Sequence, residues 1–155
     1  MFDQIFIKRK LKMIAEDLDC LKEFYDYSLD DLAKDFIKIA AVERLLERIV
    51  IRAIDINNHL IIENGKGIEK IRGYADTFKE LVNFKIYSQE LAEKLAEDAR
   101  FRNILVHEYN NVDKNLIHKK IKEVVNDFNQ YSNCILEFFC LRHHAFGRQG
   151  SPEER

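Results

Sequence analysis

Residues that break helices are almost absent from this sequence, and this constrains the fold more than any other feature. The 155 residues include one proline and five glycines, too few to form the many tight turns of a β-sandwich or a β-barrel. Apolar residues instead recur every three or four positions, which is the period of a helix with one buried stripe. The sequence therefore predicts an all-α, mostly antiparallel bundle.

About five helices are expected, and the second is the longest. Ser28, with Asp31 three residues later, is a typical helix N-cap. The apolar period that follows continues without a breaker to Leu60, and Gly65 then ends the helix. The other helices are expected at residues 2–25, 74–82, 88–109 and 116–140. This arrangement predicts one domain over residues 1–140, followed by a mobile tail at residues 141–155.

Charged residues of both signs alternate along the long second helix, as in Arg52 and Asp55. Such residues are typical of a solvated face, where each pair one turn apart contributes only about 0.3–0.5 kcal/mol to stability. The length of the helix also suits a role in a subunit interface.

The overall charge argues against broad nucleic-acid binding. The chain has 25 basic and 27 acidic residues, which gives a net charge of −2. A protein that coats nucleic acid through many phosphate contacts has a marked excess of basic residues.

Several other classes of protein are disfavoured by what the sequence lacks. It has no apolar run of about 18 residues, so no membrane span is expected, and its first residues do not resemble a secretory signal. The three cysteines, Cys20, Cys134 and Cys140, form no CxxC pair and predict reduced thiols in a cytoplasmic protein. No cofactor and no metal site are expected.

The segment at residues 100–109, RFRNILVHEY, is the one stretch with a chemical pattern. At about 100° per residue, Arg102 and Tyr109 fall on one face of a helix, and Asn103 and His107 share a neighbouring face. Histidine serves as a general acid or base near neutral pH, and arginine binds phosphate through a planar fork of donors. The pattern suits phosphodiester cleavage, although the same residue types are also common as ordinary surface and capping residues.

RNA cleavage needs both a base and an acid, and a single copy of His107 supplies only one of them. A symmetric dimer that places two His107 side chains across one cleft would supply both.

Residues 102–109 also resemble the RNxLVHxY signature of the HepT-like toxins, a branch of the HEPN superfamily. Further matches to that family lie at residues 43–45, 53–56, 59–60 and 73–81. Together they cover roughly residues 40–125, and several spaced matches are far more specific than one Arg and His pair.

This resemblance implies a HEPN-type helical bundle that dimerises, and a metal-independent endoribonuclease that leaves a 2′,3′-cyclic phosphate. It implies that Arg102 binds the scissile phosphate, that His107 is the acid or base, and that Asn103 positions the site. Arg100, two residues before Arg102, is a further candidate for contact with RNA.

The resemblance also implies a protein partner. Tyr109 matches the tyrosine to which an MntA-like minimal nucleotidyltransferase antitoxin transfers AMP, and the added charge would block the RNA phosphate. An alternative is a non-catalytic HEPN module that docks a nucleotidyltransferase, and a weaker alternative is a structural helical adaptor.

Two other groups of residues give weaker signals. Asp98 is expected to form an ordinary helix pair with Arg102, one turn later. Cys140 with His143 and His144 lacks a fourth metal ligand at sensible spacing.

Overall fold

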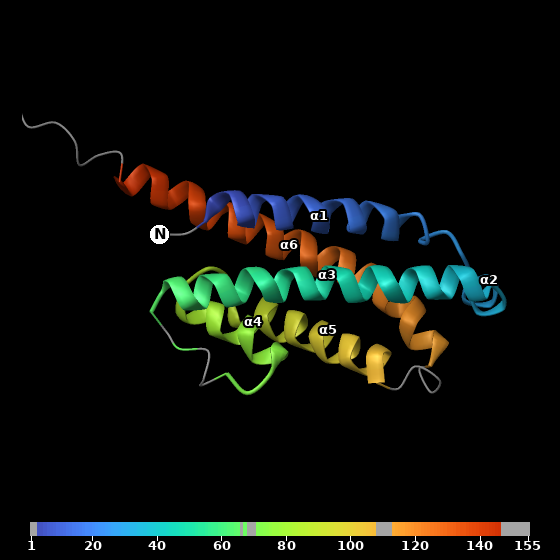
Figure 1. The fold of residues 1–155 in the computed structure, drawn as a ribbon. Coiled ribbons are helices and arrows are strands. Elements are labelled where there is room, and N and C mark those ends of the chain that lie inside the picture. The colour runs from blue at the N-terminus through green and yellow to red at the C-terminus, as the bar shows by residue number, and fades with distance from the viewer. Residues whose placement is uncertain (1–2, 66, 68–70, 108–112, 147–155) are drawn as a thin grey trace, which may run out of the picture.

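The computed structural model describes residues 3–65, 67, 71–107 and 113–146, and every regular element in these ranges is an α-helix. The predicted all-α class is therefore confirmed (Figure 1). In chain order the helices are α1 (Gln4–Lys22), α2 (Leu29–Lys34), α3 (Phe36–Glu63), α4 (Tyr74–Asn83), α5 (Gln89–His107) and α6 (Lys114–Phe146).

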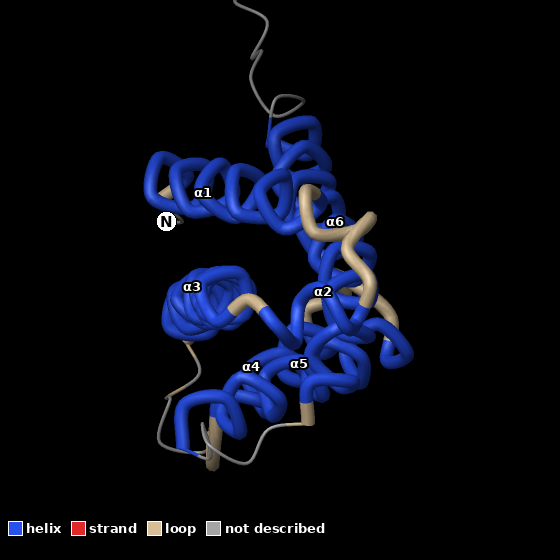
Figure 2. Tube along the Cα trace, turned by 90° about the vertical axis from the view of Figure 1, so that its right-hand side faces the viewer, coloured by secondary structure: helices blue, strands red, loops and turns tan. Residues whose placement is uncertain are grey.

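Helix α3 is the centre of the bundle, because it contacts each of the other five described helices. Helix α1 lies on one side of it and the pair α4 and α5 on the other, with α6 running obliquely across the bundle (Figures 1 and 2). The apolar stripes of all six helices meet in one buried core. The carboxyl end of α5 lies at the same end of the bundle as α2 and the start of α6.

The long second helix predicted from the sequence is in fact two helices, so the described chain has six helices and not five. The Ser28 cap is confirmed, since its hydroxyl accepts a hydrogen bond from the Asp31 amide at 3.1 Å. The break comes at Asp35, which has an extended backbone conformation. Its carboxylate accepts hydrogen bonds from the amides of Ile37 and Lys38, both at 3.1 Å. Aspartate competes in this way with the backbone ladder of a helix and starts a new one.

Two further predicted helix boundaries are confirmed by the local geometry. Gly65 follows the end of α3 with a φ of 73°, a left-handed conformation that favours glycine. The Ser88 hydroxyl accepts a hydrogen bond from the Leu91 amide at 3.3 Å, and α5 begins at the next residue.

Helix α6 continues beyond the predicted boundary at residue 140 and ends at Phe146. Residues 141–146, expected to be part of a tail, are therefore helical. The expectation was wrong because an apolar period shows only where a helix packs against the core. Backbone hydrogen bonds can continue the helix beyond that contact. Leu141 is largely exposed at this point. The rest of the predicted tail lies outside the described residues.

The charges along α3 contact other helices more than they contact one another, so the predicted solvated face is wrong for most of them. Arg52 and Arg48 both pair with the buried carboxylate of Asp17 on α1. Asp55 pairs with Lys10 of α1 at 2.7 Å. Helix α1 covers this side of α3. The charged residues that were expected to face solvent therefore form polar contacts between the two helices.

A buried polar network fixes α4 against α3 and α6. The Tyr131 hydroxyl donates a hydrogen bond to Asn57 at 2.8 Å, and the Asn57 amide donates to Thr77 at 3.1 Å. The Thr77 hydroxyl in turn donates to the backbone oxygen of Tyr74 at 2.7 Å. The first turn of α4, which carries Tyr74, is thereby held in place.

Candidate functional site

Arg102 lies on the side of α5 that faces the other helices, and its side chain is only 12% exposed. One terminal nitrogen, Nη2, is 3.5 Å from Oε1 of Glu47 on α3. The other, Nη1, donates a hydrogen bond of 3.2 Å to the side-chain oxygen of Asn103. The ring centre of Tyr74 lies 5.9 Å from the central guanidinium carbon, within the range of a cation–π contact. Side chains from α3, α4 and α5 therefore surround one guanidinium.

Glu47 is shared between two arginines. Its Oε1 faces Arg102, and its Oε2 accepts a hydrogen bond of 3.0 Å from Nη1 of Arg44, one turn earlier on α3. The Arg44 side chain is 67% exposed, whereas that of Glu47 is 26% exposed. The carboxylate thus links a largely exposed cation to a largely buried one.

His107 is the last residue of α5. The final carbonyl groups of a helix lack partners within it, and the helix dipole there favours a cationic imidazole. The His107 side chain and all of Tyr109 lie outside what the structure describes, so their predicted roles stay predictions. A contact between Asn103 and His107, which their shared face of the helix would allow, also stays a prediction, whereas the Asn103 oxygen faces Arg102.

Arg100 is exposed and does not share a side of α5 with Arg102. Two residues on a helix differ by two rotations of about 100°, so they point in nearly opposite directions. Within one chain the two arginines are not brought together, and RNA contact by Arg100 stays a prediction.

The ion pair expected between Asp98 and Arg102 is not the one observed. Asp98 is 1% exposed and pairs instead with Lys120 of α6, at 2.9 Å. The spacing of one turn allows a pair on the same helix, but α6 supplies a closer cation that is buried with Asp98.

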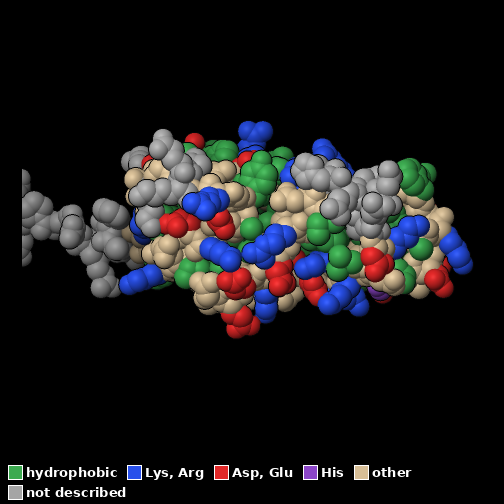
Figure 3. Space-filling view, turned by 90° about the horizontal axis from the view of Figure 1, so that it is seen from below, with side chains coloured by type: hydrophobic (Ala, Val, Ile, Leu, Met, Phe, Trp, Pro, Cys, Tyr) green, Lys and Arg blue, Asp and Glu red, His purple; other side chains and the backbone are tan. Residues whose placement is uncertain are grey.

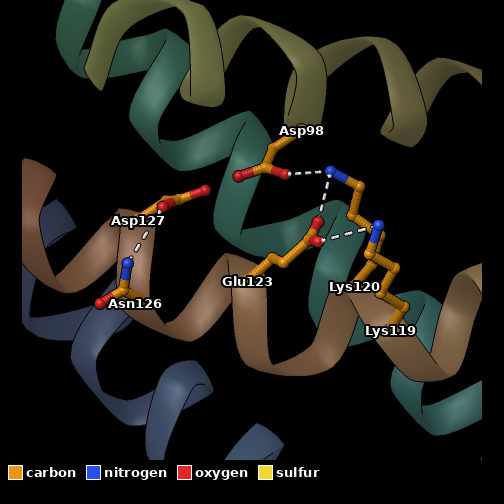
Figure 4. Close-up of polar contacts among 6 residues, drawn as sticks. All are labelled: Asp98, Lys119, Lys120, Glu123, Asn126 and Asp127. Atoms are coloured by element: carbon orange, nitrogen blue, oxygen red, sulfur yellow. Dashed lines mark hydrogen bonds and ion pairs between the residues drawn. The ribbon is translucent and has the colours of Figure 1, made fainter. Parts of the chain in front are cut away.

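Lys120 belongs to a polar cluster between α5 and α6, in which Asp98, Lys120 and Asp127 are buried and Glu123 is partly exposed (Figure 4). Lys120 also pairs with Glu123 at 3.0 Å, and the Asp127 carboxyl points towards Asp98. Burial, and to a lesser degree the neighbouring Asp127, raises the pKa of Asp98 to about 7, against the opposing effect of Lys120. This cluster, which includes no residue of the Arg-x4-His-x-Tyr motif, lies one turn before Arg102.

Glu47 and Lys120 were not predicted as partners of α5 residues. Each is on a different helix from its partner, and no local spacing indicates such contacts. Tyr74 had a partial signal, because it lies in the segment at residues 73–81 that matches the family.

The remaining histidines with described side chains have structural contacts. His59 accepts a hydrogen bond from the amide of Asp3 at 3.1 Å. A ring nitrogen of His118 lies 3.0 Å from the backbone oxygen of Tyr27. Over the described residues, no group of three or more potential ligands is placed to hold a metal ion.

The surface around α4 and α5 carries basic and acidic side chains interspersed with one another (Figure 3). This distribution agrees with the balanced overall charge. In the part of the chain that is described, every helix is too short or too polar to cross a bilayer.

Most of this chain matches a known protein family. The model of a family described as "Ribonuclease HepT-like" matches residues 14–135. A tRNA nuclease HepT of Aphanizomenon flos-aquae is 34% identical over 131 residues, which are 83% of this chain and 86% of that protein. An mRNA nuclease HepT of Shewanella oneidensis is 26% identical over 127 residues, 81% of this chain and 94% of that protein.

The fold is similar to that of a solved HEPN toxin. This is the tri-AMPylated Shewanella oneidensis HEPN toxin in complex with an MNT antitoxin. The two chains superpose with a TM-score of 0.77 at 26% identity, over 88% of this chain and 99% of that one.

Proposed function

Because this chain belongs to the HepT-like ribonuclease family, we propose that it is the ribonuclease toxin of a toxin–antitoxin pair and acts in the cytoplasm. The main support for this proposal is the position of the Arg102 guanidinium, which contacts Glu47, Asn103 and Tyr74 near the carboxyl end of α5. A cation fixed beside the helix end that bears His107 suits the binding of a phosphodiester.

The proposed reaction uses the 2′-hydroxyl of the RNA as the attacking group. One His107 accepts the proton from that hydroxyl while the 2′ oxygen forms a bond to phosphorus. The bond from phosphorus to the 5′ oxygen breaks, and a second His107 donates a proton to the leaving oxygen. The products are a 2′,3′-cyclic phosphate and a 5′-hydroxyl. Arg102 stabilises the negative charge that develops on the phosphate, with Asn103 beside it, and no metal ion takes part.

The active form is a homodimer in this proposal, since each chain contributes one His107. Two copies of the motif facing one cleft create a local positive field. Such a field is compatible with a net charge of −2, because a small cleft needs few phosphate contacts. Arg100 is included as a contact to RNA outside the reacting phosphate.

Tyr109 is the proposed site of control by a cognate MntA-like nucleotidyltransferase. The tyrosine hydroxyl attacks the α-phosphate of ATP, forms an ester with AMP and releases pyrophosphate. Each AMP adds bulk and negative charge next to the place where the RNA phosphate binds, so it opposes substrate binding. The similar Shewanella oneidensis toxin, which was solved in its tri-AMPylated form with an MNT antitoxin, supports this part of the proposal.

The direct test of the reaction is incubation of the purified protein with single-stranded RNA and tRNA in the presence of excess EDTA. We expect cleavage that leaves a cyclic phosphate, identified by mass spectrometry of the 3′ ends. A protein that binds an MntA-like partner tightly but never cuts RNA would instead be the non-catalytic docking module.

The test of control is incubation with the cognate antitoxin and ATP. The intact mass should rise in whole units of AMP, and Tyr109→Phe should show no such rise. An unchanged mass for the parent protein, under conditions in which the antitoxin consumes ATP, would contradict modification at Tyr109.

A further inference from the structure

We propose that Glu47 is a positioning residue, which fixes the Arg102 guanidinium in the orientation that the scissile phosphate requires. The inference rests on the proposed function and extends it to a residue outside the Arg-x4-His-x-Tyr motif. The motif supplies the cation from α5, and α3 supplies the carboxylate that orients it.

The contacts of Glu47 make it suited to this role. Its two oxygens each face one arginine, with Oε1 at 3.5 Å from Arg102 and Oε2 at 3.0 Å from Arg44. The contact with Arg44 limits rotation of the carboxylate, since each oxygen then has an arginine partner that a rotation would separate from it. Helix α3 contacts the other five described helices, so the carboxylate is attached to the most constrained element of the fold.

The Arg102 side chain is restricted on its other sides as well. Asn103 accepts a hydrogen bond from Nη1 at 3.2 Å, and the Tyr74 ring lies 5.9 Å from the central carbon. The Nε atom is buried and, among the described residues, has no hydrogen-bond partner. Guanidinium has five N–H donors, and one contact at each terminal nitrogen leaves a further donor on each. Two neighbouring donors are what a phosphate accepts in a bidentate contact.

A purely stabilising role explains the arrangement less well than a positioning role does. Lys10 and Asp55 form a comparable pair between α1 and α3, with side chains 25% and 41% exposed. Partly exposed pairs of this kind contribute at most about 1 kcal/mol to stability. Glu47 differs from Asp55 in that its partner is a motif residue, where a displacement of about 1 Å can reduce the rate about 100-fold. Asp55 is therefore the matched control for Glu47.

The experiment compares Glu47→Ala, Glu47→Gln and Asp55→Asn with the parent in steady-state RNA cleavage. We expect Glu47→Ala to lower kcat at least about 10-fold with KM changed less than about 3-fold. Glu47→Gln keeps an acceptor oxygen and should recover part of that loss. Asp55→Asn should remain within about 2-fold of the parent, although it also removes an ion pair of α3.

Two results would overturn the proposal. In the first, all three variants keep the activity of the parent, so that Glu47 has no influence on Arg102. In the second, both Glu47 variants cut RNA faster and bind it more tightly, which would mean that Glu47 competes with phosphate for the guanidinium.

A second readout separates this proposal from the proposed function. The buried Nε–H of Arg102 should give a slowly exchanging signal in ¹H–¹⁵N NMR spectra, assigned by its loss in Arg102→Lys. We expect Glu47→Ala to shift this signal and speed its exchange, while Asp55→Asn leaves it unchanged. If the protein cut no RNA but the signal responded in this way, positioning would stand and the ribonuclease function would fail. A signal that Glu47→Ala does not alter would contradict positioning.

Discussion

Asp98 and Arg102 lie one turn apart on α5 and both point towards other helices, yet their surroundings differ. Asp98 is buried against α6 together with Lys120 and Asp127, and Glu123, whose side chain is 37% exposed, lies at the edge of this cluster. Arg102 is held by Glu47, which remains 26% exposed, and by the ring of Tyr74, which is 48% exposed. One oxygen of Asp98 pairs with Lys120 and the other is buried without a hydrogen-bond partner among the described residues. Arg102, in contrast, retains unused donors beside a carboxylate and a ring that are open to solvent.

This difference separates a structural ion pair from a candidate catalytic one. A buried pair contributes little net stability, but removal of one partner leaves an uncompensated charge in the interior. A partly exposed pair tolerates the loss of a partner at small cost. Substitutions on neighbouring turns of α5 should therefore affect two different properties, stability at Asp98 and activity at Arg102.

The largest effect on stability is expected for Asp98→Ala. This change leaves Lys120 buried with Glu123 as its remaining partner, and we expect a loss of about 3 kcal/mol in the free energy of unfolding. Urea unfolding followed by circular dichroism measures it. Glu97→Ala, an exposed residue beside it on α5, is the control and should change stability by less than about 0.5 kcal/mol. Equal small effects of the two changes would contradict the contrast between the regions.

A smaller effect concerns the pH dependence of stability. Burial raises the pKa of Asp98 to about 7 in the folded protein, from an ordinary value of 3.8. Between pH 4 and pH 7, the Asp98 carboxyl is therefore protonated in the folded protein but already ionised in the unfolded chain. The contribution of Asp98 to the free energy of unfolding is fully present below about pH 4. It is lost as the pH rises towards and through 7, by at most about 1.4 kcal/mol per pH unit.

Asp98→Asn removes this titration, because an amide does not ionise in that range. The variant should therefore show a weaker loss of stability between pH 5 and pH 7 than the parent, as measured by urea unfolding at each pH. Identical pH profiles for the two proteins would mean that Asp98 is ionised throughout this range in the fold.

Local sequence signals predicted much of the fold. Ser28 with Asp31, Ser88 and Gly65 mark helix ends through contacts within a few residues, and the structure confirms all three. The break at Asp35 was missed because the apolar period continues across it. An aspartate inside such a period gives no sign by itself that it will cap a new helix.

The candidate site was predicted only in part, for a different reason. The motif residues are close in sequence, so Arg102, Asn103 and His107 could be identified together. Glu47 and Lys120 lie on other helices than their partners on α5. In the sequence each resembles an ordinary charged residue on the solvated face of a helix. The carboxylate that contacts Arg102 is determined by how α3 packs against α5. The relative position of these two helices depends on packing throughout the core, which no local sequence pattern specifies.

The most direct test of the account is RNA cleavage by Arg102→Ala, measured beside its unfolding free energy. The account predicts a loss of activity of at least about 100-fold, with the fold retained and a change in stability of about 1 kcal/mol or less. Cleavage within about 3-fold of the parent would contradict the assignment of Arg102 as the phosphate-binding residue, and with it the ribonuclease site at the end of α5.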